Sequence, residues 1–177
     1  MILEVIDNRK ETEDTRTIRF KLDKKIDFKP GQFAMITLDV IRSGTKRTER
    51  KPYSFASIPG NDYIEVTVKR HNPGPFGTRM HELKIGEKVH VEFPFGIFYY
   101  DKSMGNNIVL IGAGSGIVPL MSMMRWNTKH NKDAMLRLIY SNKTKNDIIY
   151  YNELLELEKH NKNFKLHLTL TQDEDWQ

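Results

Sequence analysis

The first half of the chain consists of short segments in which apolar and polar residues alternate. The clearest is 62–70, where Ile64, Val66 and Val68 face one way and the polar residues between them face the other. Strict alternation predicts strands with one buried face. Further strands are predicted around residues 2–6 and at 15–22, 33–38, 53–58 and 88–93, with a basic loop at 42–51. Several short strands separated by turn signals favour a small antiparallel barrel or sandwich.

A different pattern begins near residue 104. Apolar strands are predicted at 107–111, 136–140 and 164–170, and helices lie between them at 120–126 and 147–159. Alternation of strand and helix is typical of a parallel, doubly wound sheet. We therefore expect two domains, 1–103 and 104–177, with the boundary at 101–106.

Composition excludes several classes of protein and of site. The 177 residues are 38% hydrophobic and 29% charged, as in an ordinary globular protein. No apolar run is long enough for a membrane span, and the N-terminus has no signal-peptide pattern, so a cytoplasmic location is expected. Cysteine is absent, which excludes disulfides, thiolate nucleophiles and Cys-ligated metal centres in this chain. The six histidines are scattered without metal-ligand spacing, and no metal site is predicted.

The net charge of +5 is concentrated in one stretch. The excess lies mostly in Arg42, Lys46, Arg47, Arg50 and Lys51. Nucleic-acid binding would call for a longer basic stripe with interleaved aromatic residues. An anionic cofactor or an acidic protein partner explains a short basic segment more economically.

Residues 50–57 combine cations, a proline, an aromatic ring and hydroxyls. Arg50 and Lys51 suit a phosphate, Tyr53 could stack on a flat ring, and Ser54 could hydrogen-bond to a ring edge. The set suits a phosphate-bearing aromatic cofactor such as a flavin nucleotide. The alternative is an edge strand opened by a proline and flanked by solvated cations.

Two glycine-rich turns precede predicted helices. Residues 71–77 lead to Thr78, which is predicted to cap a short helix at 79–83. Residues 112–119 follow a strand and precede a helix, the context of a phosphate-binding turn, although Pro119 stands where the G-x-G-x-x-G pattern has Gly or Ala. Helix N-termini bind anions through free N–H groups. Plain loop-to-helix connections are the alternative for both. The aromatic-rich stretch 93–100 suits either a core or a slot for a ring.

In this order the motifs resemble those of the ferredoxin–NADP reductase superfamily, and the resemblance covers essentially the whole chain. The matching segments are the third-strand entry 30–33, the flavin motif 51–54 (usually Arg-x-Tyr-Ser/Thr), the flavin-lining strand 66–69, the pyrophosphate turn and helix 74–78, the barrel end 93–98, the nicotinamide-nucleotide turn 112–119 (usually Gly-Gly-Thr-Gly-x-x-Pro), and 140–142 after the second nucleotide-domain strand.

The resemblance implies both the fold and the reaction. It implies an N-terminal antiparallel Greek-key β-barrel with one short helix that binds FAD. A C-terminal α/β domain with an incomplete doubly wound parallel sheet would bind NADPH or NADH. The implied enzyme is a ferredoxin/flavodoxin–NAD(P)H reductase-like flavoprotein. Hydride passes from the nicotinamide to flavin N5, and single electrons then pass to an acidic carrier such as ferredoxin, flavodoxin or a haem protein.

The resemblance also assigns roles to residues. Tyr53 would stack on the flavin and Ser54 would hydrogen-bond near N5, which makes these two the catalytic candidates. Lys51, with Arg50, would neutralise flavin phosphate, while Gly77 and Thr78 would offer backbone N–H donors. The full set of cofactor-binding candidates is Arg50, Lys51, Pro52, Tyr53, Ser54, Val68, Lys69, Phe76, Gly77, Thr78, Gly112, Ala113, Gly114, Ser115, Gly116, Pro119, Ser141 and Asn142.

The chain departs from the family pattern in several places. Lys51 replaces the usual Arg, so a bidentate phosphate contact becomes a point charge unless Arg50 substitutes. Pro75 and Ala113 replace common glycines. The chain ends at Gln177, where the family continues through two more strands. The alternatives are therefore a flavin-binding electron-transfer subunit or fragment without an independent nicotinamide site, and a non-catalytic basic barrel. The acceptor, NADH versus NADPH, FAD versus FMN and the oligomeric state stay open.

Overall fold

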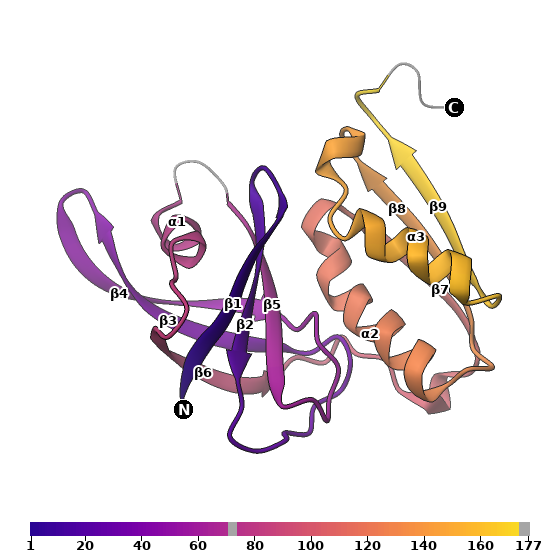
Figure 1. The fold of residues 1–177 in the computed structure, drawn as a ribbon, viewed down its shortest axis with the longest axis horizontal. Coiled ribbons are helices and arrows are strands. Elements are labelled where there is room, and N and C mark those ends of the chain that lie inside the picture. The colour runs from indigo at the N-terminus through magenta and orange to yellow at the C-terminus, as the bar shows by residue number, and fades with distance from the viewer. Residues whose placement is uncertain (71–73, 174–177) are drawn as a thin grey trace.

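The computed structural model describes residues 1–70 and 74–173, which form two sheets side by side (Figure 1). The first sheet contains six strands: β1 (Ile2–Thr12), β2 (Thr15–Lys21), β3 (Phe33–Arg42), β4 (Thr45–Ser54), β5 (Tyr63–Lys69) and β6 (Lys88–Phe95). The second contains three: β7 (Asn107–Ala113), β8 (Met135–Asn142) and β9 (Phe164–Leu170). The helices are α1 (Pro75–His81), α2 (Ile117–His130) and α3 (Tyr151–His160).

The first sheet is an antiparallel barrel with strand order β4-β3-β6-β1-β2-β5. A bridge between Phe55, which directly follows β4, and Val66 of β5 joins the two outer strands of this order. Closing the sheet in this way removes open strand edges. The interior is packed with apolar side chains, among them Ile18, Phe20 and Ile36, which are fully buried. The core of this unit is therefore the inside of the barrel.

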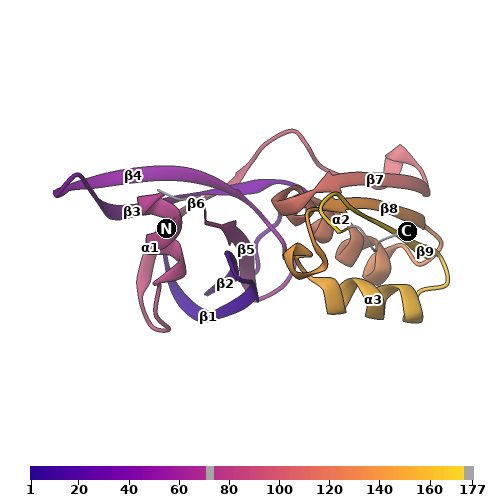
Figure 2. The same ribbon diagram turned by 90° about the horizontal axis from the view of Figure 1, so that it is seen from above.

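The second sheet is parallel, with strand order β7-β8-β9. Both α2 and α3 lie on one face of it (Figure 2). This follows because the chain moves across the sheet in one direction and each crossover is right-handed. The other face exposes Val109, Ile111, Met135 and Ile139. We call β7–β9 with α2 and α3 the α/β unit; its core includes Met121, Tyr140 and Leu154.

The predicted fold class is confirmed, since an antiparallel barrel is followed by a parallel sheet with helices. The predicted basic loop at 42–51 is wrong, because these residues belong to the hairpin of β3 and β4. Ser43 and Gly44 form its turn with φ of 50° and 75°. Positive φ at both central residues is the mark of a tight hairpin turn. Residues 42–51 of this hairpin carry exposed polar side chains on both faces, so they lack the alternation that identifies a half-buried strand.

The predicted strand at 53–58 is also wrong in its bounds. The strand β4 ends at Ser54, and beyond it Phe55 makes an isolated bridge. The chain then turns so that the N–H of Ala56 donates to the carbonyl of Glu65 at 2.8 Å. Phe55 is buried in the barrel core and Ala56 in the core of the α/β unit, so the burial along 55–58 comes from two different neighbours and not from a continuing strand.

The predicted first helix, 79–83 with Thr78 as its cap, is wrong in its bounds as well. The helix α1 begins at Pro75 with Gly74 as its N-cap, and Thr78 lies inside it. Proline suits the first helical position because its φ is preset and the N–H it lacks would have no partner there. The preceding part of the predicted turn, 71–73, lies outside the described residues. In the α/β unit, α2 extends beyond the predicted 120–126 at both ends, and α3 begins at Tyr151 rather than at 147.

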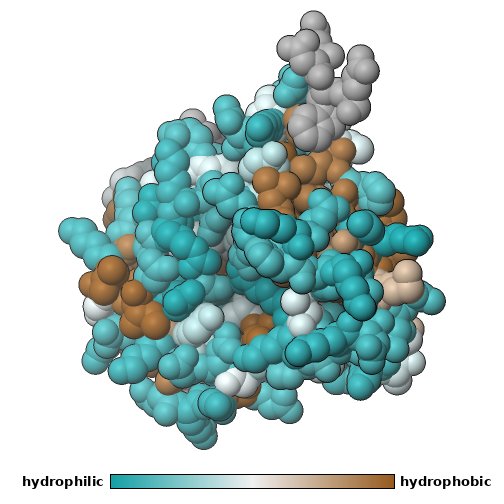
Figure 3. All heavy atoms as spheres, turned by 45° about the vertical axis from the view of Figure 1, so that its right-hand side comes forward, coloured by the Kyte–Doolittle hydropathy of each residue, from teal (hydrophilic) through white to brown (hydrophobic). Residues whose placement is uncertain are grey.

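The side of the molecule that carries the α/β unit is mostly hydrophilic (Figure 3). Within residues 1–70 and 74–173, no helix has the length and apolar character needed to cross a membrane.

Candidate functional site

The predicted flavin motif lies at the end of β4, beside α1. Successive side chains of a strand point to opposite faces, so Lys51 and Tyr53 share one face and Arg50 and Ser54 the other. The ring of Tyr53 stacks on Phe76 of α1 with centroids 5.9 Å apart and planes inclined by 20°. Burial raises the pKa of Tyr53 to about 12, so its hydroxyl is neutral at physiological pH. The motif is thus tied to the short helix through two stacked rings.

The two predicted phosphate cations are separated by this alternation. Arg50 is paired with Glu92 on β6, and its guanidinium lies 5.7 Å from the centroid of the Phe95 ring. Lys51 is half-exposed, and its Nζ lies 3.9 Å from Glu49 Oε2. That oxygen of Glu49 is buried and has no hydrogen-bond partner among the described residues. Lys51, and not Arg50, is therefore the cation on the same face as Tyr53.

A groove of about 780 Å³ lies between the β3–β4 hairpin and α1. Its lining contains three cations, each paired with a carboxylate, two acidic residues and a hydroxyl: Arg42, Lys46, Arg79, Asp39, Glu82 and Thr78. The N–H of Thr78 donates to the carbonyl of Gly74 at 3.0 Å, so it is not available to a ligand as the sequence had suggested. Gly77 belongs to the first turn of α1, where N–H groups have no partner within the helix.

Two further candidates, Val68 and Lys69, lie at the end of β5. The side chain of Val68 is fully buried in the barrel core, and its carbonyl oxygen lies 2.8 Å from His81 Nε2. Lys69 is paired with Asp14 at 3.3 Å. Neither side chain lines the groove beside α1. Val68 is enclosed as a whole residue, main chain included, so it offers no open contact to a cofactor in this structure.

The second glycine-rich turn joins β7 to α2. Gly114, Ser115 and Gly116 form a 3-10 turn, η2 (Gly114–Gly116), which packs against β5 of the barrel. Gly114 has φ of 49°, a left-handed conformation that favours glycine. A Cβ built on Gly114 or Gly116 meets no described atom within 4 Å, whereas one on Gly112 would lie 2.9 Å from Leu120 Cδ1. The turn is therefore open for a ligand at its tip and tightly packed at its base.

Other predicted nucleotide contacts lie beside this turn. Ala113 of β7 pairs with Ser141 of β8, and Tyr140 donates a hydrogen bond to the Gly114 carbonyl at 2.8 Å. Asn142 ends β8, is only 6% exposed, and its side-chain amide has no hydrogen-bond partner in the described part of the chain. Ligands of open α/β sheets bind at the carboxyl ends of the strands. Pro119 lies in the first turn of α2, where its missing N–H costs no helical bond.

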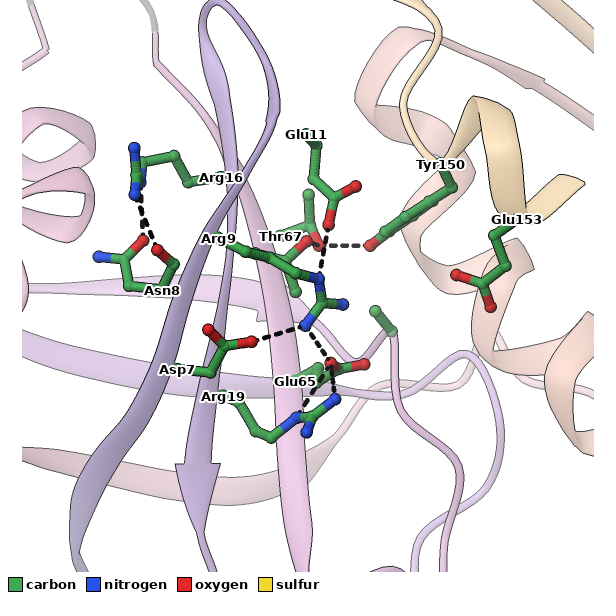
Figure 4. A network of polar contacts seen from close by, with 12 residues as sticks. Asp7, Asn8, Arg9, Glu11, Arg16, Arg19, Glu65, Thr67, Tyr150 and Glu153 are labelled. Carbon is green, nitrogen blue, oxygen red and sulfur yellow. Dashed lines mark hydrogen bonds and ion pairs between the residues drawn. The ribbon is translucent and has the colours of Figure 1, made fainter. Parts of the chain in front are cut away.

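The sequence reasoning missed Glu65, a carboxylate buried between the two units. It is paired with Arg9, Arg19 and Arg125, and the first two converge on it from the barrel (Figure 4). Burial acts to raise the pKa of Glu65, but Arg125 and Arg9 outweigh it and hold the pKa below its usual range. Glutamate is uncommon in strands, and that was the only signal the sequence held.

Comparison with known proteins identifies both halves of the chain. Residues 2–100 match the oxidoreductase FAD-binding domain and residues 110–177 the oxidoreductase NAD-binding domain. The chain is 33% identical over 162 residues to a glycine betaine monooxygenase reductase subunit of Chromohalobacter salexigens. That match covers 89% of this chain and 43% of the relative, so the chain spans less than half of the relative's length.

Solved structures have the same fold. The FAD/NAD-binding domain of a nitric oxide dioxygenase from Vibrio cholerae O1 biovar El Tor aligns with a TM-score of 0.88 at 21% identity, covering 98% of this chain and 75% of that one. A ferredoxin NADP+ reductase from Neisseria gonorrhoeae with bound FAD and NADP aligns with a TM-score of 0.82 at 19% identity, covering 99% and 70%. These structures share the fold, and the two family models show that the chain belongs to the ferredoxin–NADP reductase superfamily, with an FAD-binding domain followed by an NAD-binding domain.

Proposed function

We propose that this chain holds FAD on its barrel and passes electrons between NADH or NADPH and a one-electron acceptor. The observation that carries the proposal is that the nucleotide turn η2 packs against β5, in a barrel that carries Tyr53 and Lys51 on one face. The flavin motif also continues into Ala56 and Ser57, whose carbonyl oxygens accept hydrogen bonds from α2, so the chain connects the two candidate cofactor sites where the units touch. When bound, the flavin accepts two electrons from the nicotinamide nucleotide and releases them singly.

The barrel residues fit a flavin nucleotide. Tyr53, supported from behind by Phe76, offers a flat apolar surface, and its neutral hydroxyl adds no charge there. Lys51 supplies a cation on the same face, where the phosphate of the cofactor would be neutralised. The groove beside α1, whose lining holds three cations and two carboxylates, has room for the rest of the nucleotide. Ser54 can donate a hydrogen bond at the ring edge from the adjacent strand position.

The α/β unit fits a second nucleotide. The exposed backbone of Gly114 and Gly116 allows phosphate to approach closely at the start of α2. The unpaired amide of Asn142 can both donate and accept a hydrogen bond, which suits an amide or a ribose hydroxyl. Lys143, one residue further on, is exposed and could meet a 2′-phosphate, which would favour NADPH.

The acceptor is proposed to be a separate acidic protein or protein domain that carries single electrons. The related protein from Chromohalobacter salexigens is named as the reductase subunit of a monooxygenase, which fits delivery of electrons to an oxygenase. The exposed cations of the β3–β4 hairpin offer charge complementarity to such a partner. A cytoplasmic location remains a prediction from the sequence.

A second candidate is an electron-transfer unit that binds flavin but has no independent nicotinamide site. The observation in its favour is the apolar face of the parallel sheet, where Val109 and Ile111 are 57% and 72% exposed. Parallel sheets are normally covered on both faces. The carboxyl ends of these strands, where a nucleotide would bind, therefore lack support from the uncovered side.

The experiment is anaerobic reduction of the FAD-loaded chain. We expect NADH or NADPH to bleach the visible flavin band and ferricyanide to restore it. Gly114→Ala is expected to slow the bleaching, since φ of 49° is strained for alanine. Gly60→Ala is the matched control, because Gly60 has φ of 84° and likewise no described atom near a built Cβ. Bound flavin that neither nucleotide bleaches would support the second candidate.

A further inference from the structure

We propose that Ser122 and Arg125 of α2 are positioning residues that fix the nucleotide turn relative to the flavin motif. The inference rests on the proposed function, because it concerns how the two cofactor sites are brought into register. It starts from a set of hydrogen bonds between α2 and the main chain of the barrel, which we call the carbonyl contact. Its members are Ser122, Arg125 and the carbonyl oxygens of Ala56 and Ser57.

The barrel side of the carbonyl contact is the direct continuation of the flavin motif. Ala56 and Ser57 come two and three residues after Ser54 and are almost fully buried. Ser122 Oγ donates to the Ser57 carbonyl at 2.6 Å, and Arg125 Nη1 donates to the Ala56 carbonyl at 2.8 Å. Two donors one helical turn apart therefore bind two consecutive carbonyl groups. This geometry resists both rotation and sliding of α2 on the barrel.

The N-terminus of α2 directly follows the nucleotide turn η2. Gly116 is the N-cap of α2, and Ser122 follows six residues later, roughly 9 Å along the helix axis. A helix over this length transmits a displacement as a rigid body. Moving the carbonyl contact by a fraction of an ångström would therefore move η2 by a similar amount against β5.

The guanidinium of Arg125 is held in place by two carboxylates from different units. Its Nη1 lies 2.9 Å from Glu65 Oε2 on β5, and its Nε and Nη2 bind both oxygens of Glu153 on α3 at 2.7 and 2.6 Å. The Arg125 side chain is 17% exposed and that of Glu65 only 3%. The planar fork of arginine makes all these bonds at once, and the ammonium of lysine cannot reproduce them.

A second hydrogen bond joins the barrel to the α/β unit nearby and helps to fix their relative orientation. Tyr150 and Thr67 are hydrogen-bonded through their hydroxyls, and Thr67 is bonded in turn to Thr17 at 2.7 Å. Figure 4 shows the side chain of Tyr150 reaching Thr67 on β5, with Glu153 beyond it. The Arg125 guanidinium lies 5.3 Å from the centroid of the Tyr150 ring. The junction is thus built from directional contacts, which fix an orientation as apolar contacts alone do not.

Reaction between two bound rings depends steeply on their mutual placement, so a loosened register should lower the rate more than the affinity for either cofactor. The test uses Ser122→Ala and Arg125→Lys, with Lys129→Ala as the control on an exposed position of the same helix. We expect FAD and NADH dissociation constants within about twofold of the unaltered chain, and a limiting rate of flavin reduction that falls about tenfold in Arg125→Lys and about threefold in Ser122→Ala. Lys129→Ala should leave all three unchanged.

A readout without cofactors comes from residual dipolar couplings of the cofactor-free chain. The barrel and the α/β unit of the unaltered chain should share one alignment tensor, and the two tensors should diverge in Ser122→Ala and Arg125→Lys. Unchanged limiting rates and a shared tensor in both variants would overturn the inference. So would a loss of FAD affinity as large as the loss of rate. An unaltered chain that takes up no flavin would instead contradict the proposed function, and the tensors would still decide the role of the carbonyl contact.

Discussion

The two faces of β5 are both buried, but by different chemistry. Ile64, Val66 and Val68 pack inside the barrel and are completely enclosed. Glu65 and Thr67, on the opposite face, are 2% and 5% exposed because the α/β unit covers them. Alternation along a strand therefore identifies its two faces without telling which of them meets water. Here the polar face is the junction between the two halves of the protein.

The difference matters because apolar and polar burial contribute differently to stability and to orientation. Apolar burial stabilises in proportion to area and has little directionality. Buried ion pairs contribute little net stability, since desolvation offsets most of the attraction, but removing one partner is costly. We infer that the apolar face of β5 holds the barrel together, while its polar face sets how the α/β unit is oriented upon it.

The largest effect is expected from Ile64→Ala, which opens a cavity on the apolar face. Loss of a fully buried isoleucine should lower the free energy of unfolding by about 2–5 kcal/mol. Chemical denaturation followed by circular dichroism measures it. Ile85→Ala is the control, since Ile85 is 71% exposed and its truncation should change little. Equal losses in the two variants would contradict the assignment of the core.

Glu65→Gln tests the polar face and should have the next largest effect. It leaves Arg9, Arg19 and Arg125 without their shared carboxylate, and the loss of these charge-assisted hydrogen bonds should cost about 1.5–3 kcal/mol. Because the barrel core is untouched, calorimetry should separate unfolding of the α/β unit from that of the barrel. A single transition at the original temperature would show that Glu65 does not hold the units together.

Acid should weaken the same contact. The pKa of Glu65 in the folded chain lies below the reference value of 4.5, as Arg125 and Arg9 together outweigh the effect of burial. A depressed pKa means that the contribution is fully present above the unfolded pKa and is lost as pH falls through the folded value. Unfolding free energies measured from neutral to acidic pH should therefore fall more steeply in the unaltered chain than in Glu65→Gln. Parallel curves would exclude this role.

A smaller effect is expected from removing the two predicted phosphate cations, Arg50 and Lys51, one at a time. Lys51→Ala should weaken FAD binding about tenfold, the loss of one charge-assisted phosphate contact. Arg50→Ala should change affinity little, because Arg50 is already paired with Glu92 on the other face. Fluorescence titration measures both. A larger loss in Arg50→Ala would mean that Arg50 leaves Glu92 to supply the guanidinium the family motif usually has.

Much of the fold followed from periodicity. The strand at 62–70 was predicted almost to its ends, since Ile64, Val66 and Val68 alternate without interruption. The hairpin arm at 42–51 was missed because charged residues on both of its faces hide the pattern. The start of α1 was misplaced because Thr78 is a good N-cap, yet Pro75 three residues earlier begins the helix.

Less of the site could be predicted, because sequence order does not show which side chains share a face. Arg50 and Lys51 were grouped as neighbours, and the strand sends them to opposite sides. The junction was missed altogether: Glu65 and Arg125 are 60 positions apart, and each on its own is consistent with a solvated surface. Their pairing depends on how α2 docks on the barrel, which is a tertiary property.

The central claim is that the barrel binds a flavin through the face that carries Tyr53 and Lys51. Its most direct test is titration of FAD with the purified chain, followed by flavin fluorescence. We predict saturable quenching at one FAD per chain, and weaker binding with less quenching in Tyr53→Leu, which removes the aromatic surface. Flavin fluorescence that does not change as the folded, unaltered chain is added would contradict the account.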